Sequence, residues 1–353
     1  MIVVIYGSEI AKNTYDVLAA SDISAYLNAD MAVSIKPNLV VPCPASDGAT
    51  THPEVVEGII HFLSDYGVKR IKIIESSWVG DSTKRAFKYC GYEELSRKYN
   101  VPLIDLKSDS HAVYRFGEYS IAINDEAMNT DFLVNVPVLK AHCQALMTCC
   151  MKNLKGCIPD AEKRRFHSLG IHKPVAALNM LIKTGYCVID GICGDLSFEE
   201  GGAPVTANRI IAGRDPLLLD SYCAQLIGYR PDEIAYISYG KKIGVGELFS
   251  RETILVELNA QAKPAVDAKR NRVAQKYQRL IDEDAACSAC YSSLVYALHR
   301  LGGNPRVNGK ISIGQGFTGK SGAGTGVGNC TRGFDKYVRG CPPKATDIID
   351  ALR

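Results

Sequence analysis

The chain has 353 residues, of which 46% are hydrophobic and 22% charged, and its formal net charge is +3. This composition is typical of a globular protein, and the length suggests two or three domains. A nearly neutral balance without a long block of Lys or Arg argues against nucleic-acid binding, and no stretch approaches 18 consecutive apolar residues. We therefore expect a cytoplasmic protein that binds neither nucleic acid nor membrane.

The chain contains thirteen cysteines, a high number for a cytoplasmic protein. The apolar run at the N-terminus is too short for a signal peptide, and it predicts an opening β-strand instead. Without a secretory signal, a disulfide framework is not expected at this length. The pattern favours reduced thiols, some of them metal ligands, and it fits an anaerobic source.

A β-α-β pattern follows the opening strand. Residues 32–35 predict a short strand that leads into Lys36-Pro37-Asn38. Thr51 is the expected N-cap of the next helix, and Gly67 is its expected C′ glycine. The following strand ends at Glu75. A strand, a helix and a second strand in this order predict parallel pairing.

The alternation continues for another 150 residues. The pattern predicts a helical stretch at 81–100 broken near Gly91, a short strand at 101–106, an added antiparallel strand at 119–124, buried strands at 131–140 and 186–194, and a strand, turn and helix at 209–228. This order predicts an α/β fold with a doubly wound, mostly parallel, Rossmann-like sheet and helices on both faces.

The composition changes near residue 258. Residues 258–286 are polar and charged, which indicates a linker with an exposed helix. We therefore expect an α/β domain at 1–258, followed at 259–353 by the linker helix and a small module rich in cysteine and glycine.

Four cysteines near the C-terminus form the most specific motif. Cys287 and Cys290 make a CxxC pair, Cys330 lies in a Gly-rich segment, and Cys341 precedes two prolines. Proline directly after a ligand cysteine is typical of iron–sulfur proteins, and glycines let backbone N–H groups approach cluster sulfurs. A zinc site usually has two closely spaced pairs, whereas Cys330 and Cys341 are eleven residues apart. We expect one iron–sulfur cluster, 4Fe–4S rather than 2Fe–2S, with zinc or unliganded thiols as the alternatives.

A phosphate-binding motif overlaps the same segment. Residues 314–321 match the G-x-x-x-x-G-K-S pattern and follow an apolar run. A functional P-loop must open a helix, but the next residues are mostly glycine, a poor helix former. We interpret the match as part of the glycine wrap around the cysteines and expect no nucleotide there.

Polar side chains follow several predicted strands, where ligands bind in doubly wound sheets. Lysines and amides at such positions predict a site for a small anion, and imidazole or carboxylate groups could transfer a proton. The expected anion-binding residues are Lys36, Asn38, Lys140, Lys152, Asn153, Lys155 and Lys163; the expected catalytic residues are His142, His167 and Glu75.

Cys149, Cys150 and Cys157 form a second group of thiols in the same region. They could bind a metal or another cluster, but free cysteine commonly behaves as a small hydrophobic residue, and we interpret them as core.

Several motifs in order resemble one family. Val138-Leu-Lys-Ala-His142, Met151-Lys-Asn-Leu-Lys-Gly-Cys-Ile-Pro159, Lys163 and His167 resemble the signature of the domain of unknown function 362, as do the earlier Lys36-Pro37-Asn38, Thr51-His52-Pro53 and Ile74-Glu75-Ser76. The resemblance spans roughly residues 30–245. It implies an α/β fold with a pocket, and many members carry an appended iron–sulfur module. The Thr-His-Pro start is also distantly similar to the catalytic domain of lactate racemase. The module lacks the two four-cysteine runs of a bacterial ferredoxin, which favours one cluster.

Three functions fit these patterns. The first is an oxidoreductase in which the cluster exchanges electrons with a small anion, with a redox partner such as ferredoxin. The second is a racemase or lyase acting on a hydroxy acid, with a structural or Lewis-acid cluster. The third is an electron-transfer protein without chemistry of its own. A homodimer is compatible with all three.

Overall fold

The computed structural model describes residues 1–198, 201–264 and 273–353. Its main body is a mixed α/β domain around an eight-stranded sheet of order β12-β1-β11-β10-β7-β2-β3-β4. The strands are β1 (Ile2–Tyr6), β2 (Ala32–Pro37), β3 (Arg70–Glu75), β4 (Leu103–Asp105), β7 (Phe132–Val136), β10 (Tyr186–Asp195), β11 (Pro204–Gly213) and β12 (Leu255–Glu257). All adjacent pairs are parallel except the two that β11 makes with β1 and β10. The predicted mostly parallel sheet is therefore confirmed.

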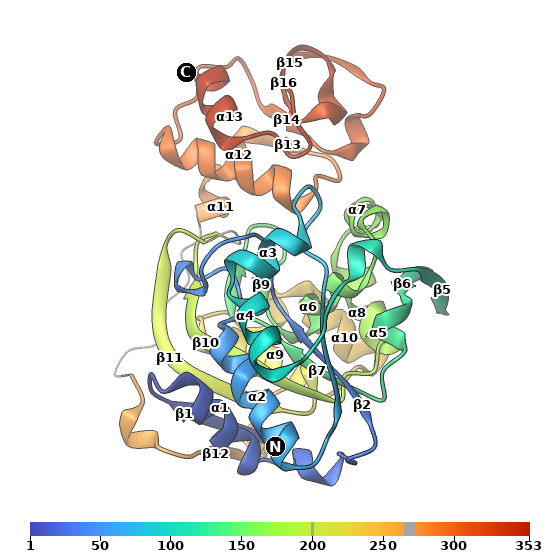
Figure 1. Ribbon diagram of the computed structural model, residues 1–353. Coiled ribbons are helices and arrows are strands. Elements are labelled where there is room, and N and C mark those ends of the chain that lie inside the picture. The colour runs from blue at the N-terminus through green and yellow to red at the C-terminus, as the bar shows by residue number, and fades with distance from the viewer. Residues whose placement is uncertain (199–200, 265–272) are drawn as a thin grey trace.

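Helices cover both faces of the sheet (Figure 1). One face packs on α1 (Ile10–Ala19), α2 (Pro53–Asp65), α3 (Thr83–Tyr89) and α4 (Tyr92–Tyr99). The other packs on α6 (Cys150–Asn153), α7 (Asp160–Ser168), α8 (His172–Leu181), α9 (Pro216–Leu226) and α10 (Ala235–Ile243). The inward faces of these helices are apolar, so two hydrophobic cores sandwich the sheet.

Two local predictions have different outcomes at helix α2. Gly67 follows the helix with a φ of +98°, as expected of a C′ glycine. The prediction that Thr51 is the N-cap is wrong, because His52 occupies that position. The Thr51 hydroxyl instead donates to the carbonyl of Val136 and accepts the amide N–H of Asn38, joining two strand ends.

Shorter elements lie outside the main sheet. The predicted antiparallel strand at 119–124 is β6 (Tyr119–Asn124), which pairs only with β5 (His111–Phe116), and a further hairpin joins β8 (Lys140–His142) to β9 (Leu146–Thr148). The remaining short helix of the body is α5 (Asp125–Met128).

The C-terminal residues form a separate layer above the strand ends of the main sheet (Figure 1). They contain a parallel sheet of β13 (Ile281–Glu283), β14 (Ile311–Ile313), β15 (Ser321–Val327) and β16 (Gly333–Val338), with α11 (Val273–Tyr277), α12 (Ser288–Arg300) and α13 (Ala345–Leu352). Part of the predicted linker helix lies at 265–272, outside the described residues. We call residues 273–353 the C-terminal module.

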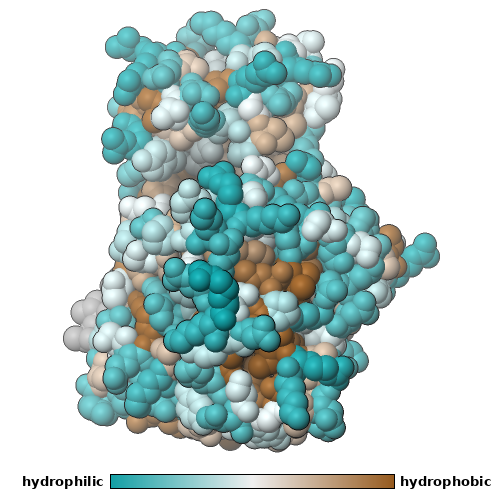
Figure 2. Space-filling view, in the orientation of Figure 1, coloured by the Kyte–Doolittle hydropathy of each residue, from teal (hydrophilic) through white to brown (hydrophobic). Residues whose placement is uncertain are grey.

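The module has its own apolar core, which Phe198 of the main body enters. Figure 2 shows hydrophilic residues over much of both parts on one face, with apolar surface exposed in the middle of the main body. Among the described residues, no helix combines the length and the apolar character that crossing a bilayer requires.

Candidate functional site

A cavity lies where the strand ends of the main sheet meet the C-terminal module. Strands β2 and β3 are parallel neighbours, so Lys36, Asn38 and Glu75 reach the same edge of the sheet. The segment from β9 through α7 covers this edge and supplies Lys152, Asn153, Lys155, Lys163, Arg164 and His167. The cavity volume is about 90 Å³. Because a single water needs roughly 10–15 Å³ on this measure, the space suits a small organic molecule.

A buried ion pair forms one wall. Lys36 and Glu75 have side chains that are 1% and 3% exposed, and Lys36 Nζ lies 2.8 Å from Glu75 Oε2. Lys36 Nζ also donates to the carbonyl of Pro37 at 2.9 Å and to Asn153 Oδ1 at 3.3 Å, which uses its three protons. Glu75 accepts two backbone N–H groups, from Leu39 and Ser76. Lys36 is thus neutralised, and Glu75 acts as a clamp on the backbone.

A chain of amides leaves one acceptor beside the cavity. Asn153 Nδ2 donates to Asn135 Oδ1 at 2.8 Å, so Asn153 Oδ1 must face Lys36 and Asn38. Asn38 Nδ2 donates to that oxygen at 2.8 Å. This fixes the orientation of the Asn38 amide, and its Oδ1 is buried without a hydrogen-bond partner in the described part of the chain. A buried acceptor of this kind calls for a donor from a ligand or water.

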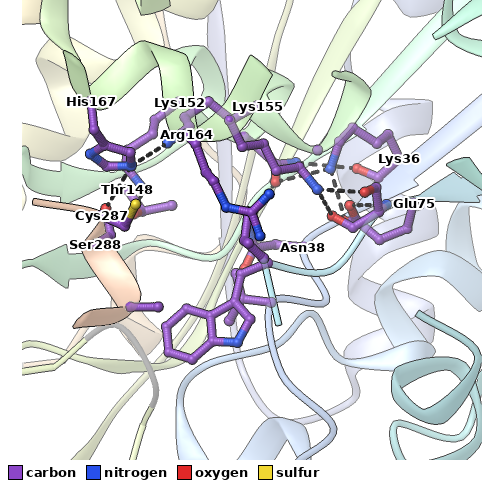
Figure 3. Close-up of a pocket in the computed structure, with 18 residues that line it drawn as sticks. Lys36, Asn38, Glu75, Thr148, Lys152, Lys155, Arg164, His167, Cys287 and Ser288 are labelled. Carbon is purple, nitrogen blue, oxygen red and sulfur yellow. Dashed lines mark hydrogen bonds and ion pairs between the residues drawn. The ribbon is translucent and has the colours of Figure 1, made fainter. Parts of the chain in front are cut away.

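The facing wall is basic. Figure 3 shows Lys36 and Glu75 at one side of the cavity, His167 with Cys287 and Ser288 at the other, and Arg164 between them. Lys155 Nζ donates to His167 Nε2 at 3.1 Å, which makes that nitrogen an acceptor. With Lys152 and Lys163 the wall carries four cationic side chains, and Glu75, the one carboxylate among the described residues that line the cavity, is paired with Lys36. The cavity is therefore suited to an anion.

Lys163 holds the turn that follows β3. It is 5% exposed, and its ammonium group donates to the carbonyls of Ser76 at 3.1 Å and Ser77 at 2.7 Å, as well as to the hydroxyl of Ser76. Burial lowers the pKa of Lys163 to about 8, although the nearby Asp160 opposes this shift.

The C-terminal module closes the cavity. Cys287, Ser288 and Ala289, at the start of α12, line it together with the lysines. Gln144 of the β8–β9 hairpin fixes this contact, because its amide donates to Glu283 Oε1 at 3.0 Å and to the carbonyl of Ala286 at 2.9 Å. Its oxygen accepts from Ser288 Oγ at 3.1 Å.

The four C-terminal cysteines converge at this end of the cavity. Burial, followed by the negative charges of Cys341 and Cys330, raises the pKa of Cys287 to about 11. Burial raises the pKa of Cys290 further, and Cys287, Cys341 and Cys330 add to the effect. Burial and mutual repulsion disfavour the thiolate forms of Cys287 and Cys290. A bound cationic group would stabilise those thiolates.

Their spacing is wider than a single ion requires. Four sulfurs about 2.3 Å from a tetrahedral zinc ion would lie about 3.8 Å apart. Among the described residues, one set of three ligand atoms lies within 4.8 Å of one another, and it includes none of these four cysteines. Gly328 lies beside Cys290, where a Cβ would come within 3.9 Å of its Sγ, so the glycine segment borders the thiols. The four thiols and the glycine segment are therefore a candidate metal-binding region.

The phosphate-binding motif does not open a helix. Residues 314–321 lead from β14 through a single 3₁₀ turn into β15. This agrees with the expectation that no helix follows the motif, as a functional P-loop would require.

Two predicted site residues lie away from the cavity. Lys140 is fully buried and donates to the carbonyl of Ala49 at 2.6 Å. His142 Nδ1 accepts the backbone N–H groups of Gln144 and Ala145, which stabilises the β8–β9 turn. Neither side chain lines the cavity. Sequence reasoning missed Arg164 and Trp78, which do line it; Trp78 is the single tryptophan and follows the Glu75 strand end.

The second thiol group is also divided. Cys149 and Cys150 lie together beside Asp220. Cys157 lies near the cavity instead: burial raises its pKa to about 12, and the charges of Lys36, Glu75 and Lys163 reach it.

Comparison with known proteins identifies the family. The model of the family described as Domain of unknown function (DUF362) matches residues 33–225, more than half of the chain. The chain belongs to the DUF362 family. The matched range contains β2, β3 and the segment from β9 through α7, and therefore most of the cavity wall. The module that supplies Cys287 lies outside it.

Two individual proteins are similar. The thylakoid-associated protein sll1697 of Synechocystis sp. (strain ATCC 27184 / PCC 6803 / Kazusa) is 25% identical over 224 residues, which are 60% of this chain and 68% of that protein. The lactate racemase apoprotein of Thermoanaerobacterium thermosaccharolyticum superposes with a TM-score of 0.43 at 13% identity. That match covers 64% of this chain and 57% of the racemase, and at this level it carries no inference about chemistry.

Proposed function

We propose that this DUF362 protein is an oxidoreductase that binds a small hydroxylated anion in the cavity, next to an iron–sulfur cluster held by Cys287, Cys290, Cys330 and Cys341. One observation carries the proposal: Cys287 lines the same cavity as the lysines and His167. A cluster ligand and an anion-binding wall would then meet at one site.

The four cysteines fit such a group by their convergence, their burial and the neighbouring glycines. When bound, a cluster supplies one-electron transfer at that end of the cavity. Four thiolates suit 4Fe–4S and 2Fe–2S centres alike, and the wide spacing of the ligand atoms agrees with either.

The remaining residues bind and orient the substrate. Arg164, Lys152 and Lys155 are placed to attract a carboxylate, and arginine can bind both of its oxygens. Asn38 Oδ1 is placed to accept a hydroxyl hydrogen, since it has no hydrogen-bond partner among the residues that the structure describes. Together these groups select a molecule with a negative charge and a neighbouring donor, such as a small hydroxy acid.

His167 is the best placed group to hold a proton. Its Nε2 accepts a hydrogen bond from the Lys155 ammonium, so the pair already shares one proton, which it can donate to the substrate; it can take a proton from the substrate only after this one has been released to solvent. Glu75 is less suited to be the base, because Lys36 and two backbone N–H groups occupy its oxygens.

The proposal is tested on anaerobically purified protein. Iron and acid-labile sulfide should be present, and the dithionite-reduced sample should give an electron paramagnetic resonance signal. Fluorescence of Trp78, in the cavity wall, should respond to glycolate more than to acetate, which lacks the hydroxyl, or to ethylene glycol, which lacks the charge. Protein without iron would refute the cluster, and equal responses to the three probes would refute the assigned substrate class.

A non-redox racemase or lyase is the second candidate. The Lys155–His167 contact favours it, because an amine and an imidazole in contact form an acid–base pair. Turnover of a hydroxy acid that continues with the cluster locked in one oxidation state would support this candidate over the first. A bare electron carrier is the third; it requires that alanine at Lys152 and His167 leave function unchanged.

An acidic redox protein such as ferredoxin is the proposed electron partner. Cys341 is exposed, and Arg332, Arg339 and Lys344 are exposed near the cysteines in sequence. Positive charge there would attract an acidic partner and make the association rate depend on salt. Ferredoxin-dependent reduction that does not change between low and high salt would contradict this docking surface.

A further inference from the structure

A second cluster of thiols lies in the core of the main body, apart from the C-terminal cysteines. Cys149 and Cys150 enter helix α6, and Asp220 projects from α9; all three residues are fully buried. One ligand atom from each lies within 4.8 Å of the other two. The Cys149 and Cys150 sulfurs are 3.9 Å apart.

Further thiols extend this group. Cys223 follows Asp220 by three positions on α9, which places both on one face of the helix. Burial and the nearby Cys149 raise the pKa of Cys223, and burial, Cys149 and Cys187 at the start of β10 raise that of Cys150. Neither Cys223 nor Cys187 belongs to the group of ligand atoms within 4.8 Å. Three segments that are distant in sequence therefore bring thiols close to one another in the core.

Asp220 has acceptor capacity left. Its Oδ1 accepts the N–H of Cys150 at 2.7 Å and its Oδ2 accepts the N–H of Met151 at 3.1 Å. A carboxylate has about four lone pairs, so each oxygen can take another partner. Asp220 forms no ion pair with a Lys, Arg or His within the described part of the chain, although a buried carboxylate normally requires a compensating charge.

We propose that Cys149, Cys150 and Asp220 bind a single thiophilic divalent cation, with Zn²⁺ as the expected ion, and that the side chain of Cys223, one helical turn after Asp220, rotates toward the ion as the fourth ligand. Sulfurs around tetrahedral zinc lie about 3.8 Å apart, close to the Cys149–Cys150 separation. Thiolate and carboxylate oxygen are both zinc ligands, and four protein ligands make a closed structural site. Binding releases the protons of the ligand groups to solvent.

The site would fix the floor of the anion cavity. Helix α6 begins at Cys150 and carries Lys152 and Asn153, which line the cavity. A metal that joins the start of α6 to α9 would hold both residues in place. This inference does not depend on the proposed redox function, because the site lies outside the cavity and needs no cluster.

The test is metal analysis of the full chain, expressed with zinc and purified anaerobically without chelators. The proposal expects about one zinc per folded chain that a chromogenic chelator detects only after unfolding. Cys223→Ser and Asp220→Asn should each reduce this zinc several-fold and leave iron and sulfide unchanged. Cys193→Ser and Cys90→Ser, at cysteines elsewhere in the α/β body, are the matched controls and should retain the zinc.

X-ray absorption at the zinc edge distinguishes this site from zinc bound to the C-terminal cysteines. The proposed site requires three sulfurs at about 2.3 Å and one oxygen at about 2.0–2.2 Å. A spectrum with four sulfurs would overturn it, as would zinc that Cys290→Ala releases. Folded wild-type protein without zinc, or a folded Asp220→Asn variant that keeps its full zinc content, would also overturn the proposal.

Discussion

Glu75→Gln distinguishes a structural clamp from a catalytic base. The change removes the charge that faces Lys36, whose side chain is 1% exposed and therefore cannot rely on water. Removing one member of a buried ion pair typically costs about 3–5 kcal/mol of unfolding free energy. One orientation of the new amide keeps the Lys36 and Leu39 contacts and points its NH₂ group at the N–H of Ser76, which leaves a buried donor unsatisfied. We expect a loss of about 3–5 kcal/mol in total, because the two effects overlap.

A double-mutant cycle isolates the ionic part. Lys36→Met combined with Glu75→Gln removes the unpaired charge, so the double variant should be more stable than Glu75→Gln alone. The assay is urea unfolding followed by Trp78 fluorescence, with Glu54→Gln as a control at an exposed glutamate. A Glu75→Gln protein that is less than about 1 kcal/mol destabilised, yet has lost all turnover, would refute the clamp and identify Glu75 as the base.

Three further predictions concern the cavity and the module. The pKa of Lys163 is about 8 in the folded protein against an ordinary 10.5. Between these two pH values the unfolded chain therefore binds more protons than the folded protein. The unfolding free energy should rise by up to about 3 kcal/mol as the pH increases through this window. Urea titrations at each pH measure the rise, which Lys163→Met should abolish. Cys290→Ala should remove most of the iron and sulfide, whereas Cys193→Ser should remove none; equal loss in both would count against the ligand assignment. Gln144→Ala removes three hydrogen bonds to the module, worth about 0.5–1.5 kcal/mol each. It should speed amide hydrogen exchange at residues 283–289 without changing exchange in β2. Unchanged exchange at residues 283–289 would contradict the docking role of Gln144.

Hydrophobic periodicity was sufficient to predict the parallel sheet and much of the cavity. The strands that end near Lys36 and Glu75 are bounded by polar residues, and parallel pairing places those ends together. The segment from Lys152 to His167, which is polar and follows a buried strand, lies beside them in the structure. These signals are local in the sequence, and parallel pairing of the strands brings the residues that carry them together in space.

The failures concern where a strand ends and what a side chain bonds to. The run at 131–140 reads as one strand, but β7 ends at Val136, and after an isolated bridge between Val138 and Asp190 the chain enters the β8–β9 hairpin. Lys140 and His142 are therefore carried past the sheet edge. Thr51 likewise bonds across strands instead of capping its helix. Periodicity detects burial but not the partner of a polar group.

The closing of the cavity by the C-terminal module depends on contacts that no local pattern encodes. Gln144, in a short hairpin of the main body, bonds to three residues that lie about 140 positions later in the sequence. Together with Gln315, whose amide donates to the carbonyl of Arg164, and Phe198, which enters the module's core, these contacts place Cys287 beside His167 and the lysines. They bring the cysteines and the cationic wall to one site. The functional proposal therefore depends on a docking geometry that follows from the fold of the whole chain, and Gln144 is a residue at which that geometry can be perturbed without altering either a proposed cluster ligand or a residue of the cavity wall.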